Sequence, residues 1–289
     1  MCGIIGYVGR KQADPVLLEG LKKLEYRGYD SGGIGLLSTQ GKIVLRKMQG
    51  KLQNLEGLMA KQPFPEGFLG ISHTRWATHG VPNKVNSHPH RDCSGKILIV
   101  HNGIIENYEE LKLALEKKGH KFLSDTDTEI IAHLIEDNYK KDLVFAVQKS
   151  IAKLRGAFAL GVICTDHPGL LVAARIGSPL IIGLGKKENF IASDVPAILN
   201  HTKKIIYLKD GEMATLTQEK VEVFDFKGNK VKPKVDTIKF SVEAVQKQGY
   251  AHFMLKEMHE QPSVLAQMIK ARIKRKKVVL DGLALSEAT

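Results

Sequence analysis

The stretch Cys2-Gly-Ile-Ile-Gly-Tyr-Val-Gly9 opens the chain and indicates how the fold begins. It is short, apolar, rich in strand-forming residues and bounded by glycines, a pattern typical of a buried strand. A small residue at position 2 normally allows the initiator Met1 to be removed. The strand is then expected to start with a cysteine that carries both a thiol and a free α-amino group.

This pairing makes Cys2 a candidate nucleophile that needs no separate base. An α-amine has a reference pKa of about 7.7 to 8.0 and a thiol one of about 8.5, so near neutral pH the amine can accept the thiol proton. The alternative is a small buried hydrophobic residue at a strand start, as free cysteines often are. Position and composition alone leave both interpretations open.

The rest of the chain predicts more strands than helices. Helices are expected from Asp14 to about Tyr26 and over 51–61, with two or three more between 107 and 154. A hairpin is expected over 33–37 and 42–47. Further strands are expected at 68–74, 96–101, 157–165, 170–174, 180–183, 190–192, 205–208 and 221–226. Strands in consecutive groups predict an α+β layered sandwich of antiparallel sheets with packed helices.

Composition excludes several classes of protein. The 289 residues are 43% hydrophobic, which is enough for a buried core. No apolar run approaches the roughly 18 residues of a membrane span, and no signal peptide is evident, so a cytoplasmic location and no membrane partner are expected. The three cysteines, Cys2, Cys93 and Cys164, are odd in number and widely spaced, which predicts reduced thiols.

The formal net charge of +12 is unevenly distributed. Half of it lies between Lys270 and Lys277, in Lys270, Arg272, Lys274, Arg275, Lys276 and Lys277. This basic cluster has no interleaved aromatic residue and no nucleic-acid motif. It is interpreted as a solvated or interdomain surface, and no nucleic-acid partner is expected.

The C-terminal part differs in composition. Residues 230–239 are rich in Lys and predict a linker, and 253–273 have helical periodicity interrupted at Gln261-Pro262. Roughly fifty residues cannot bury a substantial core alone. This part is therefore expected to be a docking arm or the start of a larger domain.

Three loops hold the other candidate functional residues. The segment 24–33 is a charged turn punctuated by glycine, and 73–80 holds the chain's one tryptophan with an arginine and two imidazoles. Asn102 and Gly103 end a predicted strand, where an amide and a backbone N–H could form an oxyanion hole. The alternatives are ordinary polar loops and, for Asn-Gly, a common turn dipeptide.

Five ordered motifs carry a resemblance to a known family. They are Cys2-Gly-Ile-Ile-Gly6, Tyr26-Arg-Gly-Tyr-Asp-Ser31, Thr74-Arg-Trp-Ala-Thr-His-Gly80, His101-Asn-Gly-Ile-Ile-Glu-Asn107 and Asp125-Thr-Asp-Thr-Glu129. Together the motifs resemble the class II, N-terminal-nucleophile glutamine amidotransferases. Within that family the chain is most similar to the glutaminase half of the glutamine-fructose-6-phosphate aminotransferases, also called glucosamine-6-phosphate synthases.

The resemblance implies a four-layer αββα sandwich with two mostly antiparallel sheets. It also implies that residues 2–240 form a type 2 glutamine amidotransferase domain. Residues 241–289 would then be a linker and the truncated start of a sugar-isomerase-like synthase domain. Family members carry two such lobes, whereas this sequence stops after Thr289. A fragment is therefore expected, without a sugar-phosphate site, whose full-length form is a homodimer.

The resemblance also implies that glutamine is the substrate and that Cys2 attacks its side-chain amide. Asn102 and Gly103 are expected to stabilise the oxyanion, and Arg27 to lie beside the nucleophile. The substrate-binding residues are expected to be Arg75, Trp76, Thr78, His79 and Asp127. Of these, Arg75 with Thr78 and His79 would hold the α-carboxylate, Asp127 the α-ammonium, and Trp76 would gate the passage of ammonia.

Other interpretations remain at this level. Amidophosphoribosyltransferase and asparagine synthetase also begin with Cys and share the Arg-Gly turn. His88, His90 and Cys93 could ligate zinc, although no fourth ligand is evident and the favoured interpretation has no metal and no cofactor. A non-catalytic regulatory module is the third alternative.

Overall fold

The computed structural model describes residues 2–239, 249–250, 253–274 and 277–279. The chain divides into two compact units, Met1–Lys239 and Phe240–Thr289. The first unit contains two large sheets, and each unit is described by itself.

The first sheet places the N-terminal strand at its centre. Its strand order is β15-β11-β9-β10-β1-β4-β2-β3, and every neighbouring pair is antiparallel. The strands are β1 (Gly3–Val8), β2 (Ser31–Leu37), β3 (Ile43–Gln49), β4 (Leu69–Arg75), β9 (Ile181–Leu184), β10 (Asn189–Ala192), β11 (Lys204–Tyr207) and β15 (Asp236–Thr237). The strand predicted from the opening stretch is therefore β1, buried along its whole length.

The second sheet has the order β14-β13-β12-β8-β7-β6-β5, again antiparallel throughout. Its strands are β5 (His90–Arg91), β6 (Ile97–Ile105), β7 (Gly156–Cys164), β8 (Leu171–Ile176), β12 (Glu212–Leu216), β13 (Val221–Asp225) and β14 (Lys230–Val231). β6 and β7 form its longest pairing, from Ile97 with Cys164 to Ile105 with Gly156.

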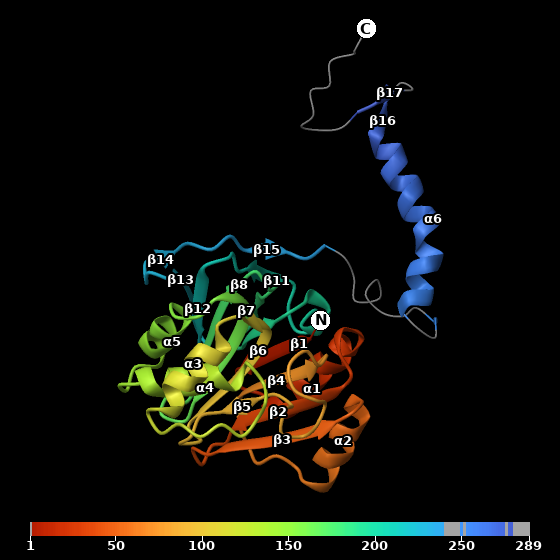
Figure 1. Ribbon diagram of the computed structural model, residues 1–289. Helices are drawn as coiled ribbons and strands as arrows, with labels where there is room; N and C mark the ends of the chain where they lie inside the picture. Colours follow the sequence, from red (N-terminus) through yellow and green to blue (C-terminus); the bar gives the residue numbers. More distant parts are fainter. Residues whose placement is uncertain (1, 240–248, 251–252, 275–276, 280–289) are drawn as a thin grey trace. The chain divides into compact units, whose positions relative to one another are not determined.

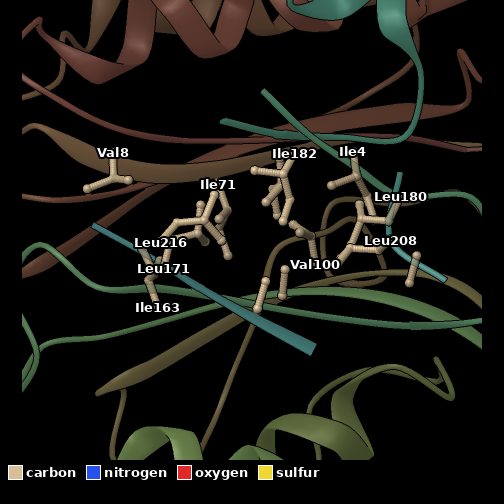
Figure 2. Close-up of a cluster of buried hydrophobic side chains, with 14 of the residues drawn as sticks. Ile4, Val8, Ile71, Val100, Ile163, Leu171, Leu180, Ile182, Leu208 and Leu216 are labelled. Atoms are coloured by element: carbon tan, nitrogen blue, oxygen red, sulfur yellow. The ribbon is translucent and has the colours of Figure 1, made fainter. Parts of the chain in front are cut away.

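The main hydrophobic core lies between the two sheets. Figure 2 shows Ile4, Ile71 and Ile182 of the first sheet facing Val100 and Ile163 of the second. Each of these side chains is buried. Removing this much apolar surface from water is the main stabilising term of the sandwich.

Helices cover the outer faces, which makes four layers (Figure 1). The helices of this unit are α1 (Ala13–Leu24), α2 (Leu52–Lys61), α3 (Tyr108–Glu116), α4 (Glu129–Asn138) and α5 (Leu143–Ile151). α1 packs on β1, β2 and β4, and α2 on β2 and β3. α4 and α5 bury their apolar sides, including Ile131 and Val147, against the second sheet. The predicted αββα sandwich with antiparallel sheets is thus confirmed.

Several expected elements differ from the structure. β12 was not predicted, because its Glu, Met and Ala residues have low strand propensity and its place between β8 and β13 decides its conformation. The predicted linker over 230–239 contains β14 and β15, which add short edge strands to the two sheets. The helix α6 (Phe253–Arg272) runs through Pro262 without the expected interruption. A proline removes one backbone N–H, and the remaining bonds maintain the helix.

The basic cluster is only partly described. Lys270 and Arg272 are exposed on α6, whereas Arg275 and Lys276 lie outside the described residues. Among the described residues, no helix is long and apolar enough to cross a membrane.

Candidate active site

Strand register brings the candidate nucleophile to the end of β4. β1 and β4 are antiparallel, with Gly3 opposite Thr74, so Cys2 lies where β4 ends at Arg75. β2 runs antiparallel to β4 and pairs Ser31 with Arg75. The turn at Arg27-Gly28, called the Arg-Gly turn, and the 73–80 segment are separate in sequence. Because of these pairings they converge on Cys2.

A pocket of about 600 Å³ opens at this convergence. Every residue predicted for the site lines it: Cys2, Arg27, Arg75, Trp76, Thr78, His79, Asn102, Gly103 and Asp127. Other lining residues include His88, His101, Glu106, Thr126, Thr128, Ser178 and Pro179. Cys2 directly precedes β1 and Arg75 ends β4 of the first sheet, whereas Asn102 and Gly103 lie on β6 of the second.

The thiol of Cys2 is held against the backbone of Trp76. The Trp76 N–H donates to Cys2 Sγ at 3.1 Å. Burial raises the pKa of the Cys2 thiol, while this N–H and the Arg75 guanidinium act in the opposite direction. Cys2 is therefore mainly a neutral thiol, which a nearby base must deprotonate before it can attack.

The Arg-Gly turn supports the Trp76 peptide directly. A Cβ at Gly28 would lie 2.8 Å from the Arg75 carbonyl carbon and 2.9 Å from the Trp76 nitrogen, so no side chain fits there. Asp30 closes the contact, because its N–H donates to the Arg75 carbonyl at 3.0 Å and its carboxylate accepts the Ala77 N–H at 2.9 Å. The turn thus fixes the N–H that contacts the thiol.

Arg27 anchors the backbone of Cys2. Its Nε donates to the Cys2 carbonyl at 3.3 Å, and its Nη1 forms an ion pair with Asp194 at 2.7 Å. Tyr26 also donates to Asp194, at 2.6 Å. Sequence reasoning missed Asp194, although Asp before Val195-Pro is a helix-cap signal, and its Oδ1 does accept the Val195 N–H at 2.8 Å.

Asn102 is oriented by a residue whose role was not predicted. Its Nδ2 donates to the Cys2 carbonyl at 3.0 Å, and its Oδ1 lies 2.9 Å from His73 Nε2. The same nitrogen is 3.0 Å from the His101 carbonyl. Since both neighbours are acceptors, Nε2 carries the proton. Burial lowers the pKa of His73 to about 3, so this imidazole is neutral at physiological pH.

Gly103 lies inside β6, not in the turn that Asn-Gly often forms. It pairs with Phe158 and has φ +135°, in the region that favours glycine. A Cβ at this position would overlap the Ala157 carbonyl oxygen. The backbone of β6 therefore approaches β7 at the pocket more closely than any other residue would allow.

Opposite charges line the pocket. Arg75 Nη2 donates to the carbonyls of His79 and Gly80, the latter at 2.9 Å. Its Nη1 is buried and, among the described residues, has no hydrogen-bond partner. Asp127 is only 4% exposed and accepts the Ile105 N–H at 2.8 Å. The pocket thus has an unused cationic donor and a buried carboxylate, which together match a zwitterion.

The remaining predicted residues, Trp76, Thr78 and His79, also line the pocket. Trp76 is 48% exposed, and its ring meets the edge of Tyr29 with centroids 5.8 Å apart. The His79 ring packs on Tyr108 at 5.5 Å. Thr78 lies between them in sequence and lines the pocket.

Comparison with known proteins identifies the family. A model of the glutamine amidotransferase domain matches residues 73–200. The glutamine-fructose-6-phosphate aminotransferase of Clostridium tetani is 50% identical over 99% of this chain, and that of Thermus thermophilus is 49% identical over 99%. The chain belongs to the glutamine amidotransferases. It spans about half the length of these relatives, since the match covers 47% of each.

Solved structures agree with this amidotransferase fold. The glutamine phosphoribosylpyrophosphate amidotransferase of B. subtilis, complexed with ADP and GMP, superposes with a TM-score of 0.67 at 27% identity, covering 79% of this chain and 50% of that one. A glutamine aminotransferase class-II domain protein from Silicibacter pomeroyi shares the fold, with a TM-score of 0.53 at 16% identity, covering 78% and 99%.

Two of the lining residues, His88 and His101, belong to a network of buried histidines. The rings of His73 and His88 stack with centroids 4.0 Å apart, and His90 meets His88 at 4.7 Å. His101 Nδ1 lies 2.8 Å from the Thr128 hydroxyl. Burial lowers the pKa of all four imidazoles.

The zinc ligands considered from the sequence do not form one group. His90 Nε2 lies 3.2 Å from the Thr126 hydroxyl, and His88 Nδ1 accepts the His101 N–H at 3.4 Å. Cys93 lies instead beside His133, with Sγ 3.4 Å from Nδ1. Among the described residues, the group that Cys93 forms with other possible ligands consists of His120, His133 and Glu136, and it includes neither His88 nor His90.

Proposed function

We propose that this chain hydrolyses L-glutamine to glutamate and ammonia, with Cys2 as the nucleophile once Met1 has been removed. One observation carries the proposal. The pocket that contains the thiol also contains a buried guanidinium with a free donor and a buried carboxylate, from Arg75 and Asp127. A free amino acid presents both complementary charges, whereas a peptide substrate lacks one or both.

Binding would use these two charges at the α-carbon end of glutamine. Arg75 Nη1 would donate to the α-carboxylate, with Thr78 and His79 beside it. Asp127 would accept the α-ammonium. Its Oδ2 already holds one N–H, which leaves the second oxygen for the substrate. Held at this end, the substrate would extend its side-chain amide toward Cys2.

The chemical step begins with transfer of the Cys2 thiol proton to the α-amine of the same residue. The sulfur then forms a bond to the amide carbon, whose C=O electrons move onto oxygen. The Asn102 side chain and the Gly103 N–H would stabilise this oxyanion, and losing one such donor typically costs roughly 100- to 1,000-fold in rate. His73 would act as a positioning residue, because its N–H holds the Asn102 amide in one orientation.

Collapse of the intermediate breaks the carbon–nitrogen bond. The α-ammonium of Cys2 returns the proton to the leaving nitrogen, which departs as ammonia and leaves a thioester. Water, deprotonated by the same amine, then attacks the thioester and releases glutamate. The cycle restores the thiol and consumes one water.

For the whole protein, we propose the glutaminase half of a glucosamine-6-phosphate synthase, which converts glutamine and fructose 6-phosphate to glucosamine 6-phosphate and glutamate. The names and lengths of the relatives support this assignment. A synthase domain would accept the ammonia, with Trp76 gating its passage. The full-length enzyme would be a cytoplasmic homodimer.

The test is glutamate release from glutamine by purified protein whose Met1 removal is checked by intact mass. Cys2→Ala is expected to abolish release. Cys164→Ala removes a thiol that is buried between the second sheet and its helices, and it is expected to retain release. Full activity in Cys2→Ala, or an active sample in which Met1 is uniformly present, would contradict the mechanism.

A further inference from the structure

A second cluster of reactive side chains lies outside the glutamine pocket. Cys93 is in the turn after β5, His120 follows α3, and His133 and Glu136 lie one turn apart on α4. The i, i+3 spacing places the last two on one face of the helix. None of these four residues lines the glutamine pocket.

Their ligand atoms converge on one point. Cys93 Sγ lies 3.4 Å from His133 Nδ1 and 3.8 Å from His120 Nδ1. Glu136 Oε2 lies 3.1 Å from His120 Nδ1 and 3.5 Å from His133 Nδ1. All four atoms lie within 4.8 Å of one another. In a tetrahedral zinc site, bonds of about 2.0 to 2.3 Å place neighbouring ligand atoms roughly 3.3 to 3.7 Å apart.

Surrounding groups orient the ligands as a metal site requires. His133 is 1% exposed, and its Nε2 lies 3.5 Å from Glu129 Oε1. A proton donated there leaves the Nδ1 lone pair facing the cluster, the arrangement of a carboxylate–histidine–metal triad. The Lys121 N–H donates to Cys93 Sγ at 3.3 Å, which stabilises a thiolate.

The Glu136 carboxylate is fixed in the same way. The N–H groups of Cys93 and Ser94 donate to its two oxygens, each at 3.0 Å. Each oxygen has a second lone pair, so Oε2 can still coordinate an ion. A surface pocket of about 880 Å³ borders Cys93 and His133 and provides an entry path.

We propose that Cys93, His120, His133 and Glu136 bind a structural Zn²⁺ ion. A thiolate with two imidazoles favours zinc over magnesium or calcium, which prefer oxygen ligands. Four protein ligands complete a tetrahedral shell and leave no position for a catalytic water. The ion would link three parts of the chain, namely the β5–β6 turn, the segment after α3, and α4. Through Glu129, which accepts the Ser124 N–H and hydroxyl each at 2.6 Å, it would also steady the segment that leads to Asp127.

The experiment uses the full chain with Cys2→Ala as host, so that metal binding is measured without the nucleophile thiol or glutaminase activity. The protein is stripped with a chelator, dialysed and titrated with Zn²⁺ or Co²⁺. One metal per chain is expected, with tetrahedral cobalt bands and a thiolate-to-cobalt absorption. Saturating Zn²⁺ is expected to raise Tm by about 5 °C.

Cys93→Ser in the same host should lose the thiolate-to-cobalt absorption, and His120→Ala should lower affinity at least tenfold. Cys164→Ser is the matched thiol control and should bind as the host does. Circular dichroism checks that each variant is folded. Absence of stoichiometric binding in the folded host, or unchanged cobalt spectra in Cys93→Ser, would overturn the proposal and leave a hydrogen-bonded cluster only.

Discussion

At the scale of single residues, the site depends on how Asn102 is held. An amide can point either its oxygen or its nitrogen at Cys2, and the two orientations have opposite consequences for an oxyanion. The neutral His73 removes this ambiguity, because its N–H faces the amide oxygen and so directs the NH₂ group toward Cys2. A protonated imidazole is not needed, and burial disfavours it.

Replacing Asp127 tests the charge clamp. Asp127→Asn keeps an oxygen for the Ile105 N–H but loses the negative charge proposed to face the substrate ammonium. We expect kcat/KM for glutamine to fall roughly 10- to 100-fold, the worth of one hydrogen bond to a charged group. Activity on glutaramate, which lacks the α-ammonium, should change much less.

The measurement is therefore the ratio of kcat/KM for glutamine to kcat/KM for glutaramate in each protein. Asp125→Asn is the matched control, because Asp125 is exposed two residues away and does not line the pocket. If Asp127→Asn lowered the activity on both substrates equally, Asp127 would stabilise the local backbone and would not bind the ammonium group.

At the scale of elements, four neutral imidazoles connect β4, β5 and β6, and two of them line the pocket. They belong to His73, His88, His90 and His101. His88 contacts both His73 and His90, so the strand ends share one buried polar layer. Each of these side chains is at most 5% exposed. The Thr126 hydroxyl contacts the His90 ring and the Thr128 hydroxyl contacts the His101 ring. These contacts connect the layer to the segment that contains Asp127.

This histidine network predicts loss of stability in mild acid. The folded-state pKa values lie below the ordinary 6.5, and that of His73 is about 3. Below pH 6.5 the unfolded chain therefore binds protons that the native state does not. The free energy of unfolding should fall as pH falls from 6.5 toward 5, by up to about 1.4 kcal/mol per pH unit for each histidine.

Urea unfolding at several pH values in this window measures the slope. His90→Gln should reduce the slope of the free energy of unfolding against pH by about the contribution of one histidine. His167→Gln, which replaces a half-buried histidine outside the network, should not. A wild-type free energy of unfolding that did not change between pH 6.5 and 5 would contradict the prediction. The carboxylates do not account for the effect, because they titrate mainly below this range.

At the scale of the whole molecule, residues 2–239 contain both large sheets, their shared core and every residue that lines the pocket around Cys2. We therefore expect a chain ended after Lys239 to unfold cooperatively and to release glutamate at a rate within about twofold of the 289-residue chain. Thermal unfolding and the glutamate assay measure this directly. Loss of folding in the shorter chain would show that the second unit stabilises the first.

The sequence by itself determined the layered α+β sandwich, the buried N-terminal strand and the nine candidate site residues, all of which line the pocket. Apolar periodicity is a local property, and motifs such as Thr74-Arg-Trp-Ala-Thr-His-Gly80 carry their chemistry in their own letters. These features can be read without knowing which strands pair.

Only the tertiary structure decided which separate segments meet. β12 has weak strand propensity and forms because β8 and β13 flank it. Asn102 and Gly103 stay in a strand, not a turn, because β7 continues to pair with them. Strand register and layer packing also bring His73 to the Asn102 amide and Cys93 to His133, since contacts between residues distant in sequence depend on the assembled sheets and helices.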